Sequence, residues 1–477
     1  MSTDSNDIAE PPKKIWSITQ FGVQGTLLFF DSLLVALSGW IYWLIVVSRT
    51  TSNEVGQATA VFSLVTLIFT LTQLGLEYPI LKRSSTERSQ VLVTVLAIEL
   101  LLTLATIPVV FFFINNLSLL GLSRFTWMAI GILTLSSLGF VPRFALLGVS
   151  DLKSIIAIDV AGTSLKFVTG FALVSMGFGA FGMLMSFLLQ NLLVASAAIV
   201  VAKKRGFGFR LGSLKYAKEI MKDGLVNSPA KYSRMLILSL SVVLLASFGI
   251  SSSEIGIFYV ALMVSIVAVG GLASSMAYMV IPASAASKTD LSSSSARIGV
   301  SLTAPLVAAL ITSPKFILSI IGLQYESAQT ILLILSVAIL PTSITMNAIS
   351  KFNNLNESRK LIAIGSTEML TFLISFFILV HQYGTLGAAF STLIAFVSSS
   401  ILSIIWSERT LLRYFAVSGI AILSGVSCGY VVNSIHGINP FLVILASICS
   451  AMMIIFVLKN TSLAETVILV KGIISRK

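Results

Sequence analysis

Residues 89–114 read SQVLVTVLAIELLLTLATIPVVFFFI, an apolar run whose single charged side chain is Glu99. Because an α-helix rises 1.5 Å per residue, a run of this length crosses roughly 30 Å of hydrocarbon. Similar runs fill the 477-residue chain, of which 56% is hydrophobic and only 10% charged. A soluble domain needs a larger charged surface, and a membrane β-barrel would show short alternating segments instead. We therefore predict an all-α integral membrane protein.

About fourteen apolar runs are long enough to cross the membrane. We predict spans at residues 18–48, 55–77, 89–114, 125–147, 154–175, 182–202, 224–249, 255–281, 298–322, 328–350, 361–380, 385–406, 414–432 and 440–458. Basic residues gather in alternate connections and in the two tails, as at Lys82, Arg83, Lys203 and Lys204. This positive-inside asymmetry predicts a multi-pass protein of the inner (cytoplasmic) membrane with both termini in the cytoplasm. The formal net charge of +12 then reflects topology, and we expect no nucleic-acid partner.

A weak internal repeat is the most informative feature of the chain. Three short motifs recur in the same order at similar offsets: Glu54-Val-Gly56 with Glu254-Ile-Gly256, Asp151–Ile158 with Glu357–Ile364, and Gly179-x-x-Gly182 with Gly384-x-x-Gly387. The repeat covers six helices, an even number, so both copies have the same orientation. It predicts two six-helix bundles related by a pseudo-two-fold axis along the membrane normal, with two additional C-terminal helices. Parallel repeats are a transporter design, with the substrate site between the halves near the midplane.

The repeat predicts the division of the chain. We expect a cytoplasmic tail at residues 1–14, an N-terminal six-helix lobe at 15–202, a basic cytoplasmic linker at 203–223, a C-terminal six-helix lobe at 224–406, and two further helices with a cytoplasmic tail at 407–477. Within the linker, Leu214–Met221 is predicted to form a short helix at the membrane surface. We interpret the linker as a solvated basic segment that anchors to anionic lipid.

Four ionisable residues in predicted spans are candidate substrate-binding residues: Lys166, Lys231, Arg234 and Asp31. Lys231 and Arg234 are three residues apart on one helix face, where they either bind the phosphates of an anionic substrate or extend toward the inner interface. Lys166 lies near mid-depth, where it either faces a central cavity or forms a structural ion pair. Asp31 continues a polar stripe from Gln24, which lines water or packs against another helix.

Three further acids in predicted spans, Glu368, Asp159 and Glu99, are candidate ion-coupling residues. Placing an ionisable group inside a membrane costs roughly 2.5–3.5 kcal/mol, so each such residue is expected to have a structural or functional role. These acids either carry a proton or Na⁺ for coupling or pair with a buried cation.

Enzyme motifs are missing from the sequence. The two histidines, His381 and His436, stand at predicted outer helix ends, and the two cysteines lie inside late apolar runs. There is no Walker A sequence, and the predicted outer loops are too short to hold a catalytic site. We therefore expect a non-enzymatic transporter without a cofactor or bound metal.

Residues 48–85, SRTTSNEVGQATAVFSLVTLIFTLTQLGLEYPILKRSS, contain a Glu-x-Gly before the second span and a Gly-Leu followed by a basic pair at its end. This segment resembles the opening of polysaccharide-biosynthesis flippases. Gly322–Ala328 and the Gly-x-x-Gly at Gly384 match the same family in the same order. The family includes the O-antigen and lipid-linked oligosaccharide flippases. It belongs to the multidrug/oligosaccharidyl-lipid/polysaccharide exporter superfamily, together with the lipid II flippase and multidrug antiporters.

The resemblance implies a flippase that moves an isoprenoid-pyrophosphate-linked oligosaccharide from the cytoplasmic to the outer leaflet by alternating access. It implies membrane lipids as surroundings and a glycan polymerase or glycosyltransferases as further partners. One departure is that span 1 offers the acid Asp31 and no arginine, whereas the lipid II flippase has arginine there. The alternative is a multidrug or small-molecule antiporter of the same fold, but the cations Lys166, Lys231 and Arg234 favour the flippase.

Overall fold

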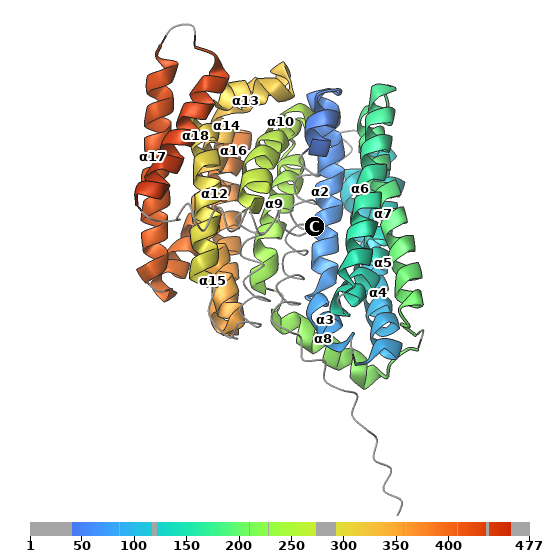
Figure 1. Ribbon diagram of the computed structural model, residues 1–477. Helices are drawn as coiled ribbons and strands as arrows, with labels where there is room; N and C mark the ends of the chain where they lie inside the picture. The colour runs from blue at the N-terminus through green and yellow to red at the C-terminus, as the bar shows by residue number, and fades with distance from the viewer. Residues whose placement is uncertain are drawn as a thin grey trace, which may run out of the picture.

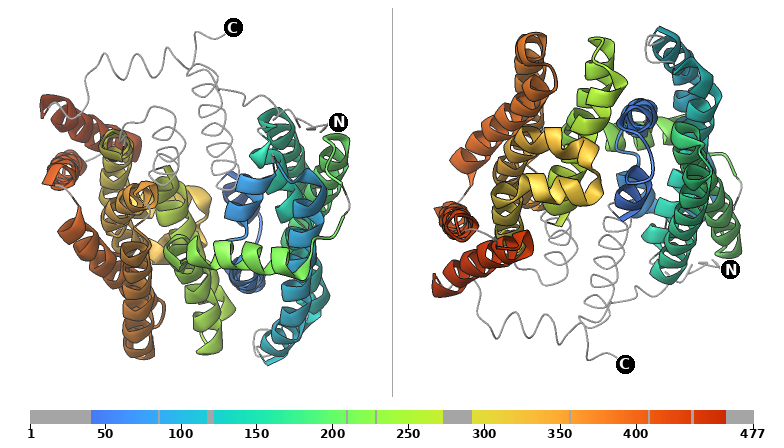
Figure 2. Two further views of the ribbon diagram at one scale, coloured as in Figure 1. Left: turned by 90° about the horizontal axis from the view of Figure 1, so that it is seen from below. Right: turned by 90° about the horizontal axis from the view of Figure 1, so that it is seen from above.

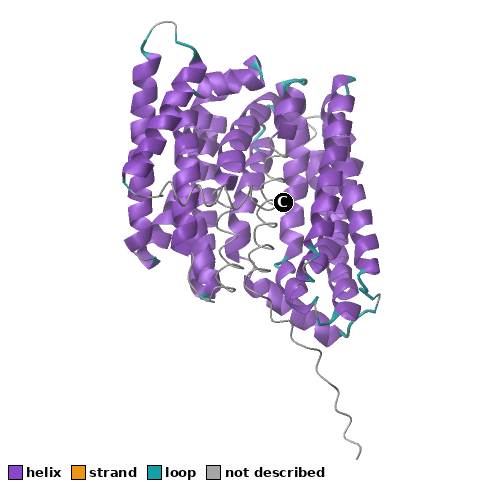
Figure 3. Cartoon of the chain, viewed as in Figure 1, coloured by secondary structure: helices purple, strands orange, loops and turns teal. Residues whose placement is uncertain are grey.

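The computed structural model describes residues 41–84, 86–116, 122–149, 151–208, 210–227, 229–272, 292–355, 357–407, 409–435 and 438–458. All regular elements in these ranges are helices (Figure 3), which confirms the all-α prediction. Most of the first predicted span lies outside the described residues, and so does Asp31.

The helices follow one another with short connections. Those before the linker are α2 (Ser52–Gln73), α3 (Glu77–Arg83), α4 (Arg88–Asn116), η2 (Ser123–Phe125), α5 (Thr126–Gly148), α6 (Leu152–Ser175) and α7 (Gly179–Lys204). The linker contains α8 (Leu214–Asn227), so the helix predicted at Leu214–Met221 is present and continues beyond Met221. The remaining elements are α9 (Pro229–Ser247), α10 (Ser252–Leu262), the π-helical η3 (Met263–Val269), α12 (Ser292–Thr312), α13 (Pro314–Ile321), η4 (Leu323–Ala328), α14 (Gln329–Val337), α15 (Ile339–Asn354), α16 (Ser358–Trp406), α17 (Arg409–Asn433) and α18 (Pro440–Val457).

The described helices correspond to the predicted membrane spans. Ten of them are long and apolar enough to cross a membrane, and a bent pair formed by α12 and α13 makes eleven. The 49-residue α16 is broken at Gly384 and so contains two predicted spans, at 361–380 and 385–406. The shorter apolar helix Met235–Ser247 and the partly described first span complete the predicted set.

The predicted straight span at 298–322 is wrong in its second half. The chain bends by 89° between Gly299–Thr312 and Pro314–Ile321. Ser313 has a non-helical backbone (φ −133°, ψ 50°), and Pro314 begins α13, where its missing N–H breaks no helical hydrogen bond. Lys315 on α13 is consequently 67% exposed, with its ammonium 3.2 Å from the carboxylate of Glu326, and is not a buried charge.

The helices form two groups that stand side by side (Figures 1 and 2). We call α2–α7 together with residues 41–47 the N-lobe, and α9–α16 the C-lobe. Helices α17 and α18 pack against α12 on the outside of the C-lobe. Helix α8 lies across one end of the N-lobe, here called the α8 end, which is the predicted cytoplasmic side. Helix α13 lies at the opposite end, here called the α13 end.

The buried core explains how the lobes are joined. One large cluster contains residues of both lobes, such as Trp43 and Val55 from the N-lobe and Tyr259 from the C-lobe. At the α8 end each lobe has its own small cluster, around Ile80 in the N-lobe and Phe352 in the C-lobe. The described residues of the two lobes therefore share a core toward the α13 end and have separate cores at the α8 end.

The glycine repeat has a common structural cause in both lobes. Gly179 and Gly384 have left-handed φ angles of +44° and +54°, and each stands where the chain reverses between two antiparallel helices. A side chain on Gly182 or Gly387 would press into the helix just before the turn. Both copies thus need glycine for the turn and for the close approach of the following helix.

Candidate functional site

The predicted site residues lie in several parts of the structure. Asp31 is outside the described residues. Lys231 and Arg234 belong to α9, but their side chains are also outside the described part of the structure. The four remaining residues occupy separate environments, with Lys166 and Asp159 on α6, Glu99 on α4 and Glu368 on α16.

Lys166 is enclosed by aromatic rings inside the N-lobe. Its side chain is only 6% exposed, and the ammonium lies 4.9 Å from the ring centre of Tyr42 and 5.3 Å from that of Phe187. The Tyr42 hydroxyl is hydrogen-bonded to the Ser186 hydroxyl at 2.6 Å, which fixes the ring. Among the described residues, no carboxylate or hydroxyl lies within hydrogen-bonding distance of the Lys166 ammonium. Ring faces offset about 0.5–2 kcal/mol of the cost of burying a cation, so this charge is poorly compensated.

The aromatic rings around Lys166 continue to the junction of the lobes. Trp43 is 6.0 Å from Phe187 between ring centres and 5.0 Å from Tyr259, which belongs to α10 of the C-lobe. Trp43 and Tyr259 also line a small apolar cavity together with Val264 of η3. Lys166 therefore lies a few rings away from the junction of the lobes.

Asp159 forms an ion pair with Arg143 of α5. The predicted site residues do not include Arg143, although it stands inside the predicted span at 125–147 next to Pro142. Its side chain is 36% exposed, whereas that of Asp159 is almost fully buried. The carboxylate and the guanidinium compensate each other, and Arg143 is a second cation of the N-lobe in addition to Lys166.

Glu99 is a fully buried carboxyl group between α2, α4 and α5. One carboxylate oxygen accepts a hydrogen bond from the Thr72 hydroxyl at 3.1 Å. The other oxygen has no hydrogen-bond partner among the described residues. About one turn further along α4, the Thr103 hydroxyl is hydrogen-bonded to that of Ser137 at 2.7 Å. An ionised carboxylate with an unsatisfied oxygen is costly in such surroundings, so the site suits a protonated acid or one that binds a cation.

Glu368 lines a small cavity inside the C-lobe. The cavity is mainly apolar, and its other lining residues are Ser233 on α9, Thr342, Thr345, Met346 and Ile349 on α15, and Phe396. The Glu368 side chain is 3% exposed. Glu368 is therefore a buried carboxyl group beside three residues that carry hydroxyl groups, Ser233, Thr342 and Thr345.

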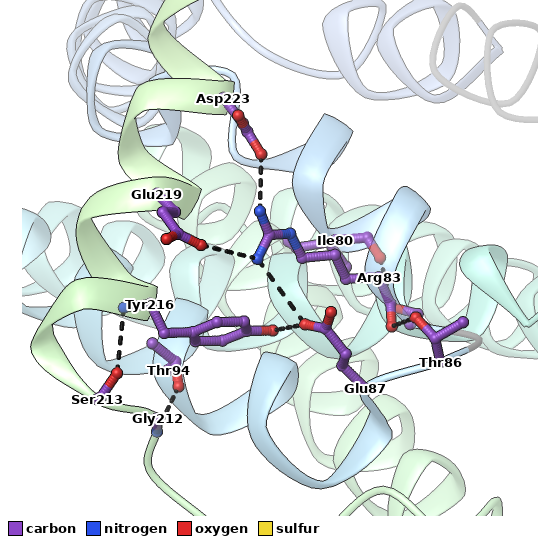
Figure 4. Close-up of polar contacts among 11 residues, drawn as sticks. Ile80, Arg83, Thr86, Glu87, Thr94, Gly212, Ser213, Tyr216, Glu219 and Asp223 are labelled. Atoms are coloured by element: carbon purple, nitrogen blue, oxygen red, sulfur yellow. Dashed lines mark hydrogen bonds and ion pairs between the residues drawn. The ribbon is translucent and has the colours of Figure 1, made fainter.

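Helix α8 is fixed to the N-lobe by a cluster of charged groups at the α8 end (Figure 4). The Arg83 guanidinium lies 2.9 Å from the Asp223 carboxylate and 3.9 Å from that of Glu219, both on α8. It also lies 5.2 Å from the ring centre of Tyr216, whose hydroxyl donates a 2.5 Å hydrogen bond to the Glu87 carboxylate. Burial and this carboxylate raise the pKa of Tyr216 to about 12, so the hydroxyl keeps its proton.

The orientation of α8 follows from this cluster. Its two acids reach Arg83, and Lys215, Lys218 and Lys222 are exposed. These contacts attach helix α8 to the N-lobe.

No family model matches the chain, and no curated protein matches it. Solved structures do match. The lipid II flippase MurJ in an inward closed conformation aligns with a TM-score of 0.66 at 13% identity, over 96% of this chain and 100% of that chain. An inward-facing multidrug resistance MATE family transporter of the MOP superfamily aligns with a TM-score of 0.62 at 17% identity, over 82% and 98%. A eukaryotic MATE transporter aligns with a TM-score of 0.51 at 11% identity, over 84% and 99%. At these identities the likeness concerns the fold, and the chain has the fold of these multi-pass transporters.

Proposed function

We propose that this protein is a flippase that moves an isoprenoid-pyrophosphate-linked oligosaccharide from the cytoplasmic to the outer leaflet of the inner membrane by alternating access. The observation that carries the proposal is Lys166, a buried cation near the junction of the lobes without an anionic partner among the described residues. A pyrophosphate would supply the missing charge and hydrogen bonds. Lys231 and Arg234, which the sequence places three residues apart on α9, are proposed as further cations for the substrate.

The physics of the substrate fits this arrangement. The head of a lipid-linked glycan is polar and anionic and cannot cross hydrocarbon, whereas its isoprenoid tail can stay in it. A path between two lobes that carries cations would lower the barrier for the head. Because the described lobes have separate cores at the α8 end, such a path would open first toward the predicted cytoplasmic side. Membrane lipids surround the path, and a glycan polymerase or glycosyltransferases would use or supply the substrate.

Ion coupling is proposed at Glu368 and Glu99. The burial of Glu368 beside Ser233, Thr342 and Thr345 and the unsatisfied oxygen of Glu99 support it. Asp159 is the third proposed coupling residue, and it would act through its ion pair with Arg143.

A multidrug antiporter is the second candidate function. Aromatic rings and buried acids also bind cationic amphiphiles, and both Glu99 and Glu368 are buried. The fold likeness to MATE transporters is similar in extent to the likeness to MurJ. The uncompensated charge of Lys166 favours the anionic substrate, because a lysine in this position would repel a cationic drug.

Deletion of the gene is expected to separate the two functions. In the deletion strain, membrane lipids are extracted, and glycan-charged isoprenoid carrier is quantified beside surface glycan. The flippase predicts accumulation of charged carrier and loss of surface glycan, both restored by the wild-type gene. Unchanged glycan and carrier, with increased sensitivity to cationic drugs, would instead assign the protein to the antiporters.

A further inference from the structure

The first turns of α2 and α10 cross at the α13 end, and the contact is between their backbones. A methyl group on Gly56 would overlap the carbonyl oxygen of Ser252, and a methyl group on Gly256 would overlap that of Ser52. Beside the glycines, the hydroxyls of Ser52 and Ser253 are hydrogen-bonded at 2.7 Å. The two copies of the repeated Glu-x-Gly motif therefore contact each other across the junction of the lobes.

Each side of this crossing is a rigid helix start. The Thr51 hydroxyl accepts a hydrogen bond from the Glu54 backbone N–H at 3.3 Å, and the Thr51 N–H donates to the Glu54 carboxylate at 3.1 Å. Ser251 and Glu254 form the same reciprocal pair at 3.3 Å in both directions. These are capping boxes, which fix the first turn of a helix. The repeated glutamates thus hold the two helix starts in shape, and the repeated glycines let them meet.

A second contact joins the lobes beside the crossing. The side-chain amide of Gln324, in η4 of the C-lobe, donates a 2.8 Å hydrogen bond to the Thr50 carbonyl of the N-lobe. These contacts of the crossing join hydroxyl, amide and backbone groups that are all neutral, and such contacts are individually weak. Close helix packing through glycine depends on van der Waals contact and is lost with a small separation. A contact of this kind can close a path firmly and still open reversibly.

We propose that residues 52–56 and 252–256 form the gate that closes the α13 end, and that Gly56 and Gly256 set the stability of its closed state. The role of this gate in transport rests on the proposed function, whereas its opening and closing do not. The two copies of the motif meet directly, so one pair of glycine contacts joins the two lobes here. Opening toward the α13 end then requires the two helix starts to separate.

A disulfide across the crossing tests the gate. In a Cys428→Ser, Cys449→Ser background, Ser52→Cys with Ser253→Cys should form a disulfide under mild oxidation, because the side-chain oxygens are in contact. Transport should stop on oxidation and return on reduction. The matched control is Ser424→Cys with Ser450→Cys, whose hydroxyls are 2.9 Å apart between α17 and α18. That pair should also cross-link, with transport unchanged. Full transport by the oxidised gate pair would overturn the proposal.

Substitution of the glycines tests the same gate without any substrate. Val260→Cys, one turn after Gly256 on α10, reports access from the α13 end to a membrane-impermeant maleimide. Because a methyl group holds the helix starts apart, Gly56→Ala should raise the labelling rate by about tenfold or more. Gly419→Ala on α17, which meets open space, should leave the rate unchanged. Unchanged labelling in Gly56→Ala and Gly256→Ala alike would overturn the role of the glycines. If both tests support the gate but the protein moves no lipid-linked glycan, the proposed flippase function is wrong and the gate still stands.

Discussion

Replacing Lys166 by Gln is expected to lower transport of the lipid-linked substrate by on the order of 100-fold and to raise the stability of the folded protein. A charge-assisted hydrogen bond to phosphate contributes about 1.5–3 kcal/mol, and each 1.4 kcal/mol is about a factor of ten. In the described structure the Lys166 ammonium has two ring faces and no anionic partner. Removing a buried charge that lacks a partner relieves its desolvation cost, so activity and stability should move in opposite directions.

Two matched variants make this result interpretable. Lys153→Gln removes an exposed lysine from the same helix and should change neither transport nor thermal stability. Lys166→Arg keeps the charge and should retain more transport than Lys166→Gln. The measurements are export of the glycan by cells and thermal unfolding of the purified protein in detergent. A Lys166→Gln variant that is destabilised would show that Lys166 is part of a structural ion pair.

Replacing Glu368 by Gln is expected to remove the dependence of transport on an ion gradient. The amide has the size of the protonated carboxyl but cannot release a proton or neutralise a cation. Gradient-driven transport in proteoliposomes should fall by about tenfold or more, which corresponds to ~1.4 kcal/mol of lost coupling. Glu326→Gln, at an exposed ion pair of the α13 end, is the control and should keep its coupling. Coupling that survives in Glu368→Gln would exclude this residue as the coupling group.

The hydroxyls around Glu368 distinguish a proton from a metal cation. Thr342→Val and Thr345→Val each remove a hydroxyl group from a residue that lines the cavity and keep the shape of the side chain. A Na⁺-coupled protein should need a higher Na⁺ concentration in these variants, because Na⁺ requires several oxygen ligands. A proton-coupled protein needs only the carboxyl group, so its pH dependence should remain.

Much of the fold could be predicted because its causes are local in the sequence. Length and hydropathy indicated the spans, and the glycine motif at Gly384 indicated the turn inside α16. The bend before Pro314 was missed, although Ser313-Pro314 interrupts the predicted span. Hydropathy measures only how apolar a segment is, and α13 is apolar whether it crosses the membrane or lies across its surface.

The surroundings of the candidate residues could not be predicted in the same way. Lys166 meets Tyr42 and Phe187 through packing of distant segments, which leaves no local trace in one sequence. The repeated Glu-x-Gly motif was visible, but its function as a contact between lobes depends on Gly56 and Gly256 meeting across the junction. Arg143 could have been found, since a cation inside a predicted span requires a partner and Asp159 is one of few acids at a similar depth.

The most direct test of the flippase is reconstitution of the purified protein into liposomes with a fluorescent glycan on an isoprenoid pyrophosphate. Quenching by a reagent that cannot cross the bilayer measures the fraction of head groups in each leaflet. The wild-type protein and Lys153→Gln are predicted to move the head group between leaflets. With Lys166→Gln, the rate of this movement is predicted to be close to the rate in protein-free liposomes. If Lys166→Gln moves the head group at the wild-type rate, Lys166 is not part of an anion site. If the wild-type protein moves no head group but exports a cationic drug, the protein is not a flippase.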